Sequence, residues 1–185
     1  MSNKQYIVSA LKEFNYYKLL GEKTFSQLTD KQLFYQVSSE SNSIATIIKH
    51  LRGNMLSRWT DLLTTDGEKE WRNRDDEFEN EIYTRQALKD KWDEGWSCLF
   101  NALNSISDSD LSKTIYIRKQ SHTVLEAINR QLPHYAYHIG QIVFIGKMLS
   151  NKNWNSLSIP KGASNEFNQK MYSKPASEKN HTENK

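Results

Sequence analysis

The sequence has little of what characterises secreted or membrane-spanning proteins. Its 185 residues include one cysteine, Cys98, which cannot form an intrachain disulfide and therefore fits a reducing compartment. No apolar run approaches the roughly 20 residues of a membrane span. The first residues also lack the run of about 7–15 apolar residues that marks a secretory signal. We therefore expect a soluble, cytoplasmic protein with no membrane partner.

An excess of charge is also missing. The formal net charge is +3 at pH 7, and the charged residues of both signs are interspersed along the chain. A nucleic-acid-binding protein would more often show a basic face or a known recognition module, so we expect no nucleic-acid partner. The sequence also contains no glycine-rich phosphate loop and no nucleophile elbow. Kinase, nucleotide-binding and serine-hydrolase functions are therefore excluded.

The length of the chain suits one domain followed by a tail. A chain of this size buries roughly 70% of its unfolded surface, so its core needs no disulfide. We predict a single helical domain over residues 1–170 and a disordered tail over residues 171–185, where lysine and asparagine accumulate around Pro175. His181 falls in that tail, and we exclude it from any specific site.

Apolar residues recur at helical spacing in four long stretches, which predicts an all-α fold. The first helix is expected from residue 3 to about residue 28. The second begins near Ser41 or Asn42, either of which suits an N-cap, and the third and fourth are capped by Thr84 and Thr123. The tryptophan pair of the third helix is interpreted as packing.

The segments between these helices are less regular. Residues 64–82 are acidic, and we interpret them as a solvated loop with a turn at Asp66-Gly67. Residues 113–122 alternate apolar and polar, which predicts one short extended segment before the last long helix, with no identified pairing partner.

The last predicted helix carries two histidines four residues apart, His134 and His138. This spacing places both imidazoles on one side of a helix, about 6 Å apart, where they border the apolar stripe. His50 lies at the edge of the apolar stripe of the second helix. Neutral imidazoles are ligands for zinc and nickel. The alternative is that each is an ordinary core-edge histidine that satisfies one hydrogen bond.

Other polar residues near these histidines are candidates for supporting roles. Asn54 follows His50 by one turn, and Gln141 lies near His138, so both are candidates to hydrogen-bond groups around a metal. Both are equally compatible with ordinary amides on a helix surface. No general base is evident, because Glu126 lies about 80° away from the row of His134. Cys98 has no basic neighbour that would activate it, and we interpret it as structural.

The motifs resemble a known superfamily. Asn42-Ser43-Ile44 followed by His50-Leu51, then Gln131-Leu132-Pro133-His134 to His138-Ile139-Gly140-Gln141-Ile142, is similar to the DinB/YfiT-like superfamily of proposed metalloenzymes, closest to a branch of uncharacterised function. The resemblance implies a four-helix bundle and a homodimer. It also implies that His50, His134 and His138 hold nickel or zinc, with water in the remaining positions. Characterised members include thiol S-transferases that use bacillithiol and a mycothiol-dependent isomerase.

Three hypotheses for function follow from such a site. Three protein ligands leave a coordination position open, as in catalytic zinc sites. With the resemblance, this predicts a thiol-dependent S-transferase-like activity, in which a low-molecular-weight thiol attacks a small electrophile. A metal-dependent hydrolase that uses metal-bound hydroxide is the second hypothesis. A non-catalytic metal-binding or ligand-sensing bundle is the third.

Overall fold

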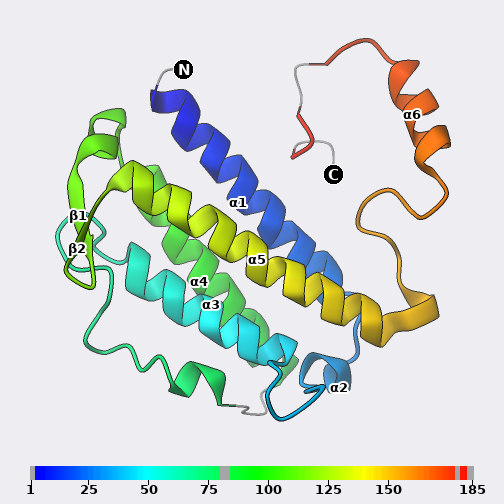
Figure 1. Ribbon diagram of the computed structural model, residues 1–185, viewed down its shortest axis with the longest axis horizontal. Coiled ribbons are helices and arrows are strands. Elements are labelled where there is room, and N and C mark those ends of the chain that lie inside the picture. Colours follow the sequence, from blue (N-terminus) through cyan, green and yellow to red (C-terminus); the bar gives the residue numbers. More distant parts are fainter. Residues whose placement is uncertain (1–2, 80–83, 178–179, 183–185) are drawn as a thin grey trace.

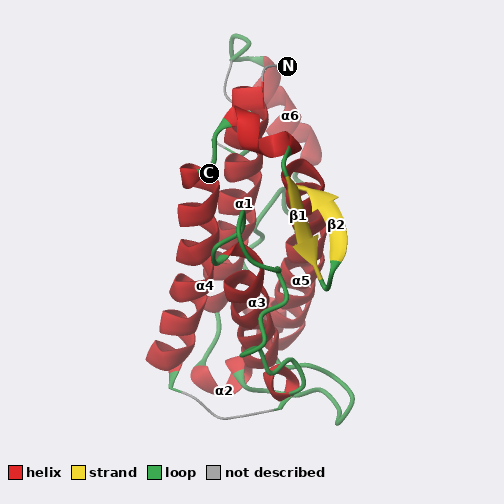
Figure 2. Cartoon of the chain, turned by 90° about the vertical axis from the view of Figure 1, so that its left-hand side faces the viewer, coloured by secondary structure: helices red, strands yellow, loops and turns green. Residues whose placement is uncertain are grey.

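The computed structural model describes residues 3–79, 84–177 and 180–182. The fold is mostly helical, as the sequence predicts. Four long helices lie alongside one another (Figure 1, Figure 2), and α1 and α3 each pack against both α4 and α5. Their bounds are α1 Asn3–Phe25, α3 Ile44–Trp59, α4 Arg85–Ser105 and α5 Val124–Ser150. The shorter elements are α2 Asp30–Leu33, η1 Asp76–Phe78, η2 Asp108–Ser112, β1 Thr114–Ile117, β2 Gln120–Thr123, η3 Asn151–Asn153 and α6 Ser164–Tyr172. None of the described helices is long and apolar enough to cross a membrane.

Side-chain caps fix where the helices begin. Thr84 and Thr123 cap α4 and α5, as predicted. The predicted start of the second helix at Ser41 or Asn42 is wrong, because the hydroxyl of Ser43 accepts the hydrogen bond from the backbone N–H of Thr46. The first helix also ends before residue 28, since Thr29 forms a capping box that starts the separate turn α2.

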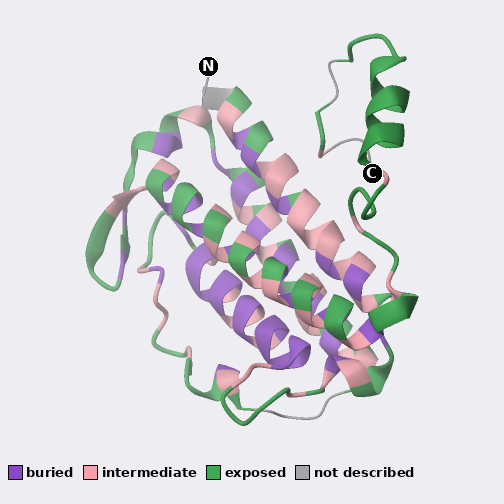
Figure 3. Cartoon of the chain, turned by 45° about the vertical axis from the view of Figure 1, so that its right-hand side comes forward, coloured by how far each residue is buried: buried purple, intermediate pink, exposed green. Residues whose placement is uncertain are grey.

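The centre of the core contains one aromatic residue from each long helix. The ring of Phe14 lies 6.4 Å from Trp59 and 5.7 Å from Tyr135, and Trp96 lies 5.9 Å from Tyr135, all measured between centroids. Trp92 packs edge-on against Trp96 at 5.4 Å, which confirms the packing role predicted for this pair. Figure 3 shows that α3 is buried over most of its surface, because α4, α5 and the segment around η1 all pack against it.

The extended segment before α5 is a hairpin of two strands, whereas the sequence predicted one strand. Strands β1 and β2 pair antiparallel, with Ile115 opposite His122. The two turn residues are Arg118 and Lys119, with φ values of 54° and 61°. Residues other than glycine rarely adopt such positive φ values. The carboxylate of Asp66 accepts hydrogen bonds of 2.8 Å from both of their backbone N–H groups. These bonds hold the turn and attach it to the loop after α3.

Helix α6 lies apart from the four long helices (Figure 1, Figure 3), and none of its residues is buried. The segment before it is attached to the bundle through Gln27, whose side chain accepts a hydrogen bond of 2.7 Å from Asn155 N and donates one of 3.2 Å to Asn155 O. The domain over residues 1–170 and the disordered tail over residues 171–185 stay predictions.

Two helical glycines provide a matched test of this packing. A Cβ at Gly21 would lie 2.6 Å from the ring of the buried Trp92, whereas one at Gly140 would meet nothing within 4 Å. We expect Gly21→Ala to lower the free energy of unfolding by about 1–3 kcal/mol, because the ring cannot move within the packed core. Gly140→Ala should leave it unchanged or raise it by up to about 1 kcal/mol. Urea denaturation measures both, and equal stability of the two variants would contradict the assigned packing.

Candidate metal centre

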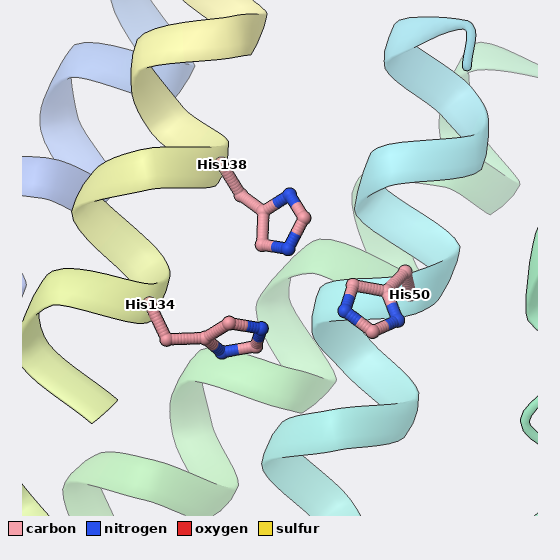
Figure 4. A group of neighbouring side chains, drawn as sticks. All are labelled: His50, His134 and His138. Carbon is pink, nitrogen blue, oxygen red and sulfur yellow. The ribbon is translucent and has the colours of Figure 1, made fainter. Parts of the chain in front are cut away.

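The three predicted histidines lie together between two helices. His50 extends from α3, and His134 and His138 extend from α5, so that the rings point toward one another (Figure 4). The ring centroid of His138 lies 4.8 Å from that of His50 and 4.8 Å from that of His134. The centroids of His50 and His134 are 5.6 Å apart. One nitrogen from each ring lies within 4.8 Å of the other two. The structure thus joins residues that are more than eighty positions apart in the chain into one cluster.

The two histidines of α5 are held in the neutral form. Burial, reinforced by the neighbouring histidines and by Arg58 and Arg72, lowers the pKa of His134 to about 3. Burial also lowers the pKa of His138, although its hydrogen bond to Gln141 opposes the shift. Neutral imidazoles keep a lone pair available, which is the form that binds a metal.

A buried carboxylate contacts the third histidine. Glu77 Oε2 accepts a hydrogen bond of 2.9 Å from His50 Nδ1, and both side chains are at most 7% exposed. Arg72 donates to the two oxygens of Glu77 at 2.7 and 2.9 Å. Burial alone would raise the pKa of Glu77, but the hydrogen bonds from Arg72 and His50 outweigh it and hold that pKa below its usual value. The carboxylate is therefore ionised and leaves Nε2 of His50 as the free ring nitrogen.

The interpretation of residues 64–82 as a solvated loop is wrong for Glu77. The described part of this run, residues 64–79, turns back over α3 and buries that side chain. Residues 80–82 lie outside the described residues. A glycine makes the contact possible, because a Cβ at Gly53 would lie 2.6 Å from Glu77 Cδ. The sequence carried no periodic signal for this contact, since the partners belong to a helix and an irregular segment.

The two amide candidates occupy different positions around the histidines. Gln141 Oε1 accepts a hydrogen bond of 2.8 Å from His138 Nδ1, which leaves Nε2 of that ring free. Asn54 bonds to a core side chain instead: its Oδ1 accepts a hydrogen bond of 3.0 Å from Tyr135 Oη. The same Tyr135 oxygen accepts a hydrogen bond of 2.9 Å from Trp59 Nε1. Among the described residues, the buried Nδ1 of His134 has no hydrogen-bond partner.

A cavity of about 270 Å³ opens beside the three histidines. Its lining is strongly basic, which the sequence analysis missed: Arg58, Arg72, Arg74, Arg118 and Arg130 all contribute. One of them could have been found by extending the histidine row of the last helix, because Arg130 precedes His134 by four residues. The remaining lining residues are the three histidines with Asn54, Phe78 and Gln131.

Other residues considered from the sequence do not line this cavity. Burial raises the pKa of the Cys98 thiol, which agrees with its interpretation as a structural residue. Glu126 instead completes the capping box of α5, where it accepts a hydrogen bond of 2.7 Å from Thr123 N. His181 contacts the ring of Tyr16 on α1.

Comparison with known proteins identifies a family but no activity. A family model described as a protein of unknown function (DUF1572) matches residues 1–163. This family is DinB/YfiT-like, so the resemblance found in the sequence is confirmed. No curated protein and no solved structure matches the chain significantly.

Removing Glu77 tests whether its contact with His50 and Arg72 holds the loop in place. We expect Glu77→Ala to lower the free energy of unfolding by about 3–5 kcal/mol, because Arg72, whose side chain is 2% exposed, would stay buried without its partner. The exposed Glu79 gives the matched control, and Glu79→Ala should change stability by less than about 0.5 kcal/mol. Denaturation curves of the two variants that coincide would contradict the buried network.

Proposed function

We propose that this chain, which belongs to the DUF1572 family, is a metal-dependent enzyme whose metal is bound by His50, His134 and His138. The convergence of three imidazoles beside an open cavity carries the proposal. We further propose that the metal is zinc or nickel, and that the reaction is the transfer of a low-molecular-weight thiol to a small electrophile. The thiol rests on the resemblance to the superfamily.

The residues present fit a divalent transition metal. The three nitrogens are donors that zinc and nickel accept. Hydrogen bonds from Nδ1 to Glu77 and Gln141 orient the rings of His50 and His138, an arrangement typical of metal-binding histidines. The unpartnered nitrogen of His134 also fits a site that is completed by a ligand. His50, His134 and His138 would each hold the ion through one ring nitrogen.

A bound divalent metal would supply Lewis acidity, which lowers the pKa of a thiol or a water molecule next to it. In the proposed transfer, the thiol sulfur forms a bond to the electrophilic carbon, the leaving group departs with its electron pair, and the thiol proton passes to solvent. Glu77 does not accept that proton, because His50 and Arg72 already donate to its oxygens. It acts by orienting His50. Cys98 lies outside the cavity lining, so the sulfur nucleophile comes from the second substrate.

A second candidate is hydrolysis of an ester or amide. The lining favours it in one respect, because among the described residues that form the cavity only Phe78 is apolar, and such a lining admits water. Hydrolysis would proceed without a thiol. A non-catalytic metal-binding or ligand-sensing bundle is the third candidate, and it would bind metal without turning over any substrate.

The finer points of the architecture are also proposals. We propose that the four long helices form the DinB-like four-helix bundle, that the protein works in the cytoplasm, and that two copies form a homodimer. Support for the dimer comes from α5, which exposes large apolar side chains on its outer face. These are Tyr137, Phe144 and Met148, with exposed fractions of 63%, 69% and 44%.

Metal content tests the site directly. After loading with zinc or nickel and gel filtration, the parent should retain about one equivalent, measured by elemental analysis. His50→Ala and His134→Ala should each retain a small fraction of that amount. Gln141→Ala should bind with about 10–100-fold lower affinity, because it removes the hydrogen bond that orients His138. His181→Ala is the matched control and should bind like the parent; equal metal in all variants would remove the three histidines from the site.

Activity assays separate the three candidate functions. Metal-loaded protein mixed with cysteine or glutathione and a haloarene should release halide and consume thiol, and a chelator should abolish both. Cys98→Ala should keep the activity, because this half-buried thiol lies outside the cavity lining and is not the nucleophile. Turnover of an ester without thiol would establish the hydrolase instead. Stoichiometric metal without turnover of either substrate would leave a binding protein and contradict the proposed transferase.

A further inference from the structure

The arginines around the cavity outnumber the carboxylates that neutralise them. Five arginines line it, while the described carboxylates within ion-pair distance of these arginines are Glu68 and Glu77 alone. Glu68 is shared, since its Oε2 lies 3.0 Å from Arg58 Nη1 and 3.1 Å from Arg118 Nε. The arginine and carboxylate side chains around the cavity therefore leave a net positive charge next to the histidines.

Arg58 and Arg72 have structural partners. The side chain of Arg58 is 6% exposed, and it donates to Gly67 O and to Glu68. Arg72 is 2% exposed and binds Glu77 in a two-point contact. These partners largely satisfy both charges within the protein. Both arginines contribute to the field inside the cavity, and Arg58 Nε is buried without a hydrogen-bond partner among the described residues.

Arg74 and Arg130 are different, because neither has a carboxylate partner within the part of the chain that the structure describes. The guanidinium of Arg74 lies 5.1 Å from the ring centroid of Phe78, so the aromatic face supports it while its N–H groups remain available. Arg130 Nη1 donates to His122 Nε2 at 3.1 Å, which orients the side chain but leaves its charge uncompensated. Both residues are exposed, and they reach the cavity from the loop and from α5 respectively.

A second observation indicates a ligand. Gln131 is only 3% exposed and lines the cavity, yet its Oε1 has no hydrogen-bond partner among the described residues. A buried polar group without a partner is unfavourable, and native proteins rarely leave one unsatisfied. Gln131 precedes His134 by three residues, so the amide lies on the histidine side of α5.

We infer that this cavity binds a small oxyanion, a molecule with a carboxylate or phosphate group held by Arg74 and Arg130 and a hydrogen-bond donor that reaches Gln131. The planar guanidinium group can donate two parallel hydrogen bonds to either kind of oxyanion. A volume of about 270 Å³ lies below the range of roughly 300–1,000 Å³ that suits drug-sized ligands, which indicates a small metabolite. That this oxyanion is the substrate of the three-histidine site rests on the proposed function.

Calorimetric titration of the full-length, metal-loaded protein with succinate, with inorganic phosphate and with succinamide tests the inference. At least one of the two anions should bind, the neutral diamide should not, and added salt should weaken binding. Arg74→Gln and Arg130→Gln should each weaken binding by about tenfold or more, because each removes a charged hydrogen bond. Arg52→Gln is the matched control, since that arginine pairs with Glu94 outside the cavity. Its affinity should equal that of the parent.

The same titrations on His50→Ala separate this inference from the proposed function. Arg74→Gln and Arg130→Gln should keep the metal content of the parent, so that loss of anion binding is not loss of metal. Anion binding that survives in His50→Ala would support the arginine site even if no metal is bound.

The inference is overturned if neither anion binds at millimolar concentration, if succinamide binds as tightly as succinate, or if binding requires the metal but not the two arginines. Tighter binding of phosphate than of succinate would assign the ligand as a phosphate compound, and the reverse as a carboxylate.

Discussion

The buried carboxylate of Glu77 is the contact on which the rest of the site depends. It accepts hydrogen bonds from His50 and Arg72, and by doing so it holds an irregular segment of chain against α3. Moving a carboxylate out of water costs several kcal/mol, and this cost is offset only when both partners are in place. The same segment carries Arg74 and Phe78, so the contact that orients a histidine also positions the outer wall of the cavity. Ring orientation and cavity shape are therefore coupled through one side chain.

Much of the fold and the histidine cluster could be predicted from the sequence, because both follow from helical periodicity. The apolar stripes located the long helices, and the same spacing placed His50 and the pair on α5 at the edges of those stripes. The core then fixes the register in which these edges meet. Tyr135 follows His134 directly, and its hydroxyl donates to Asn54 one turn beyond His50. A hydrogen bond inside the core thus links the two helices that carry the histidines. It holds the two helix edges on which helical spacing places these residues next to each other.

The features that sequence reasoning missed are those that helical spacing does not determine. Glu77 comes from a loop, and it can approach α3 because Gly53 has no side chain at the point of contact. Helical periodicity does not show that these two positions meet. The hairpin turn at Arg118 contains no glycine or asparagine, because Asp66 supplies its hydrogen bonds from elsewhere in the chain. Arg130 differs, since it lies one turn from His134 and its position could have been predicted from the same spacing.

The fold thus brings three imidazoles together and surrounds the adjacent cavity with positive charge. We propose that these imidazoles are the ligands of a metal ion. X-ray absorption spectroscopy of the zinc- or nickel-loaded protein tests it most directly. We expect nitrogen or oxygen donors at about 2.0–2.1 Å for zinc, with the multiple scattering of three imidazoles, reduced to two in His50→Ala. A spectrum without imidazole scattering, or one that His50→Ala leaves unchanged, would contradict it.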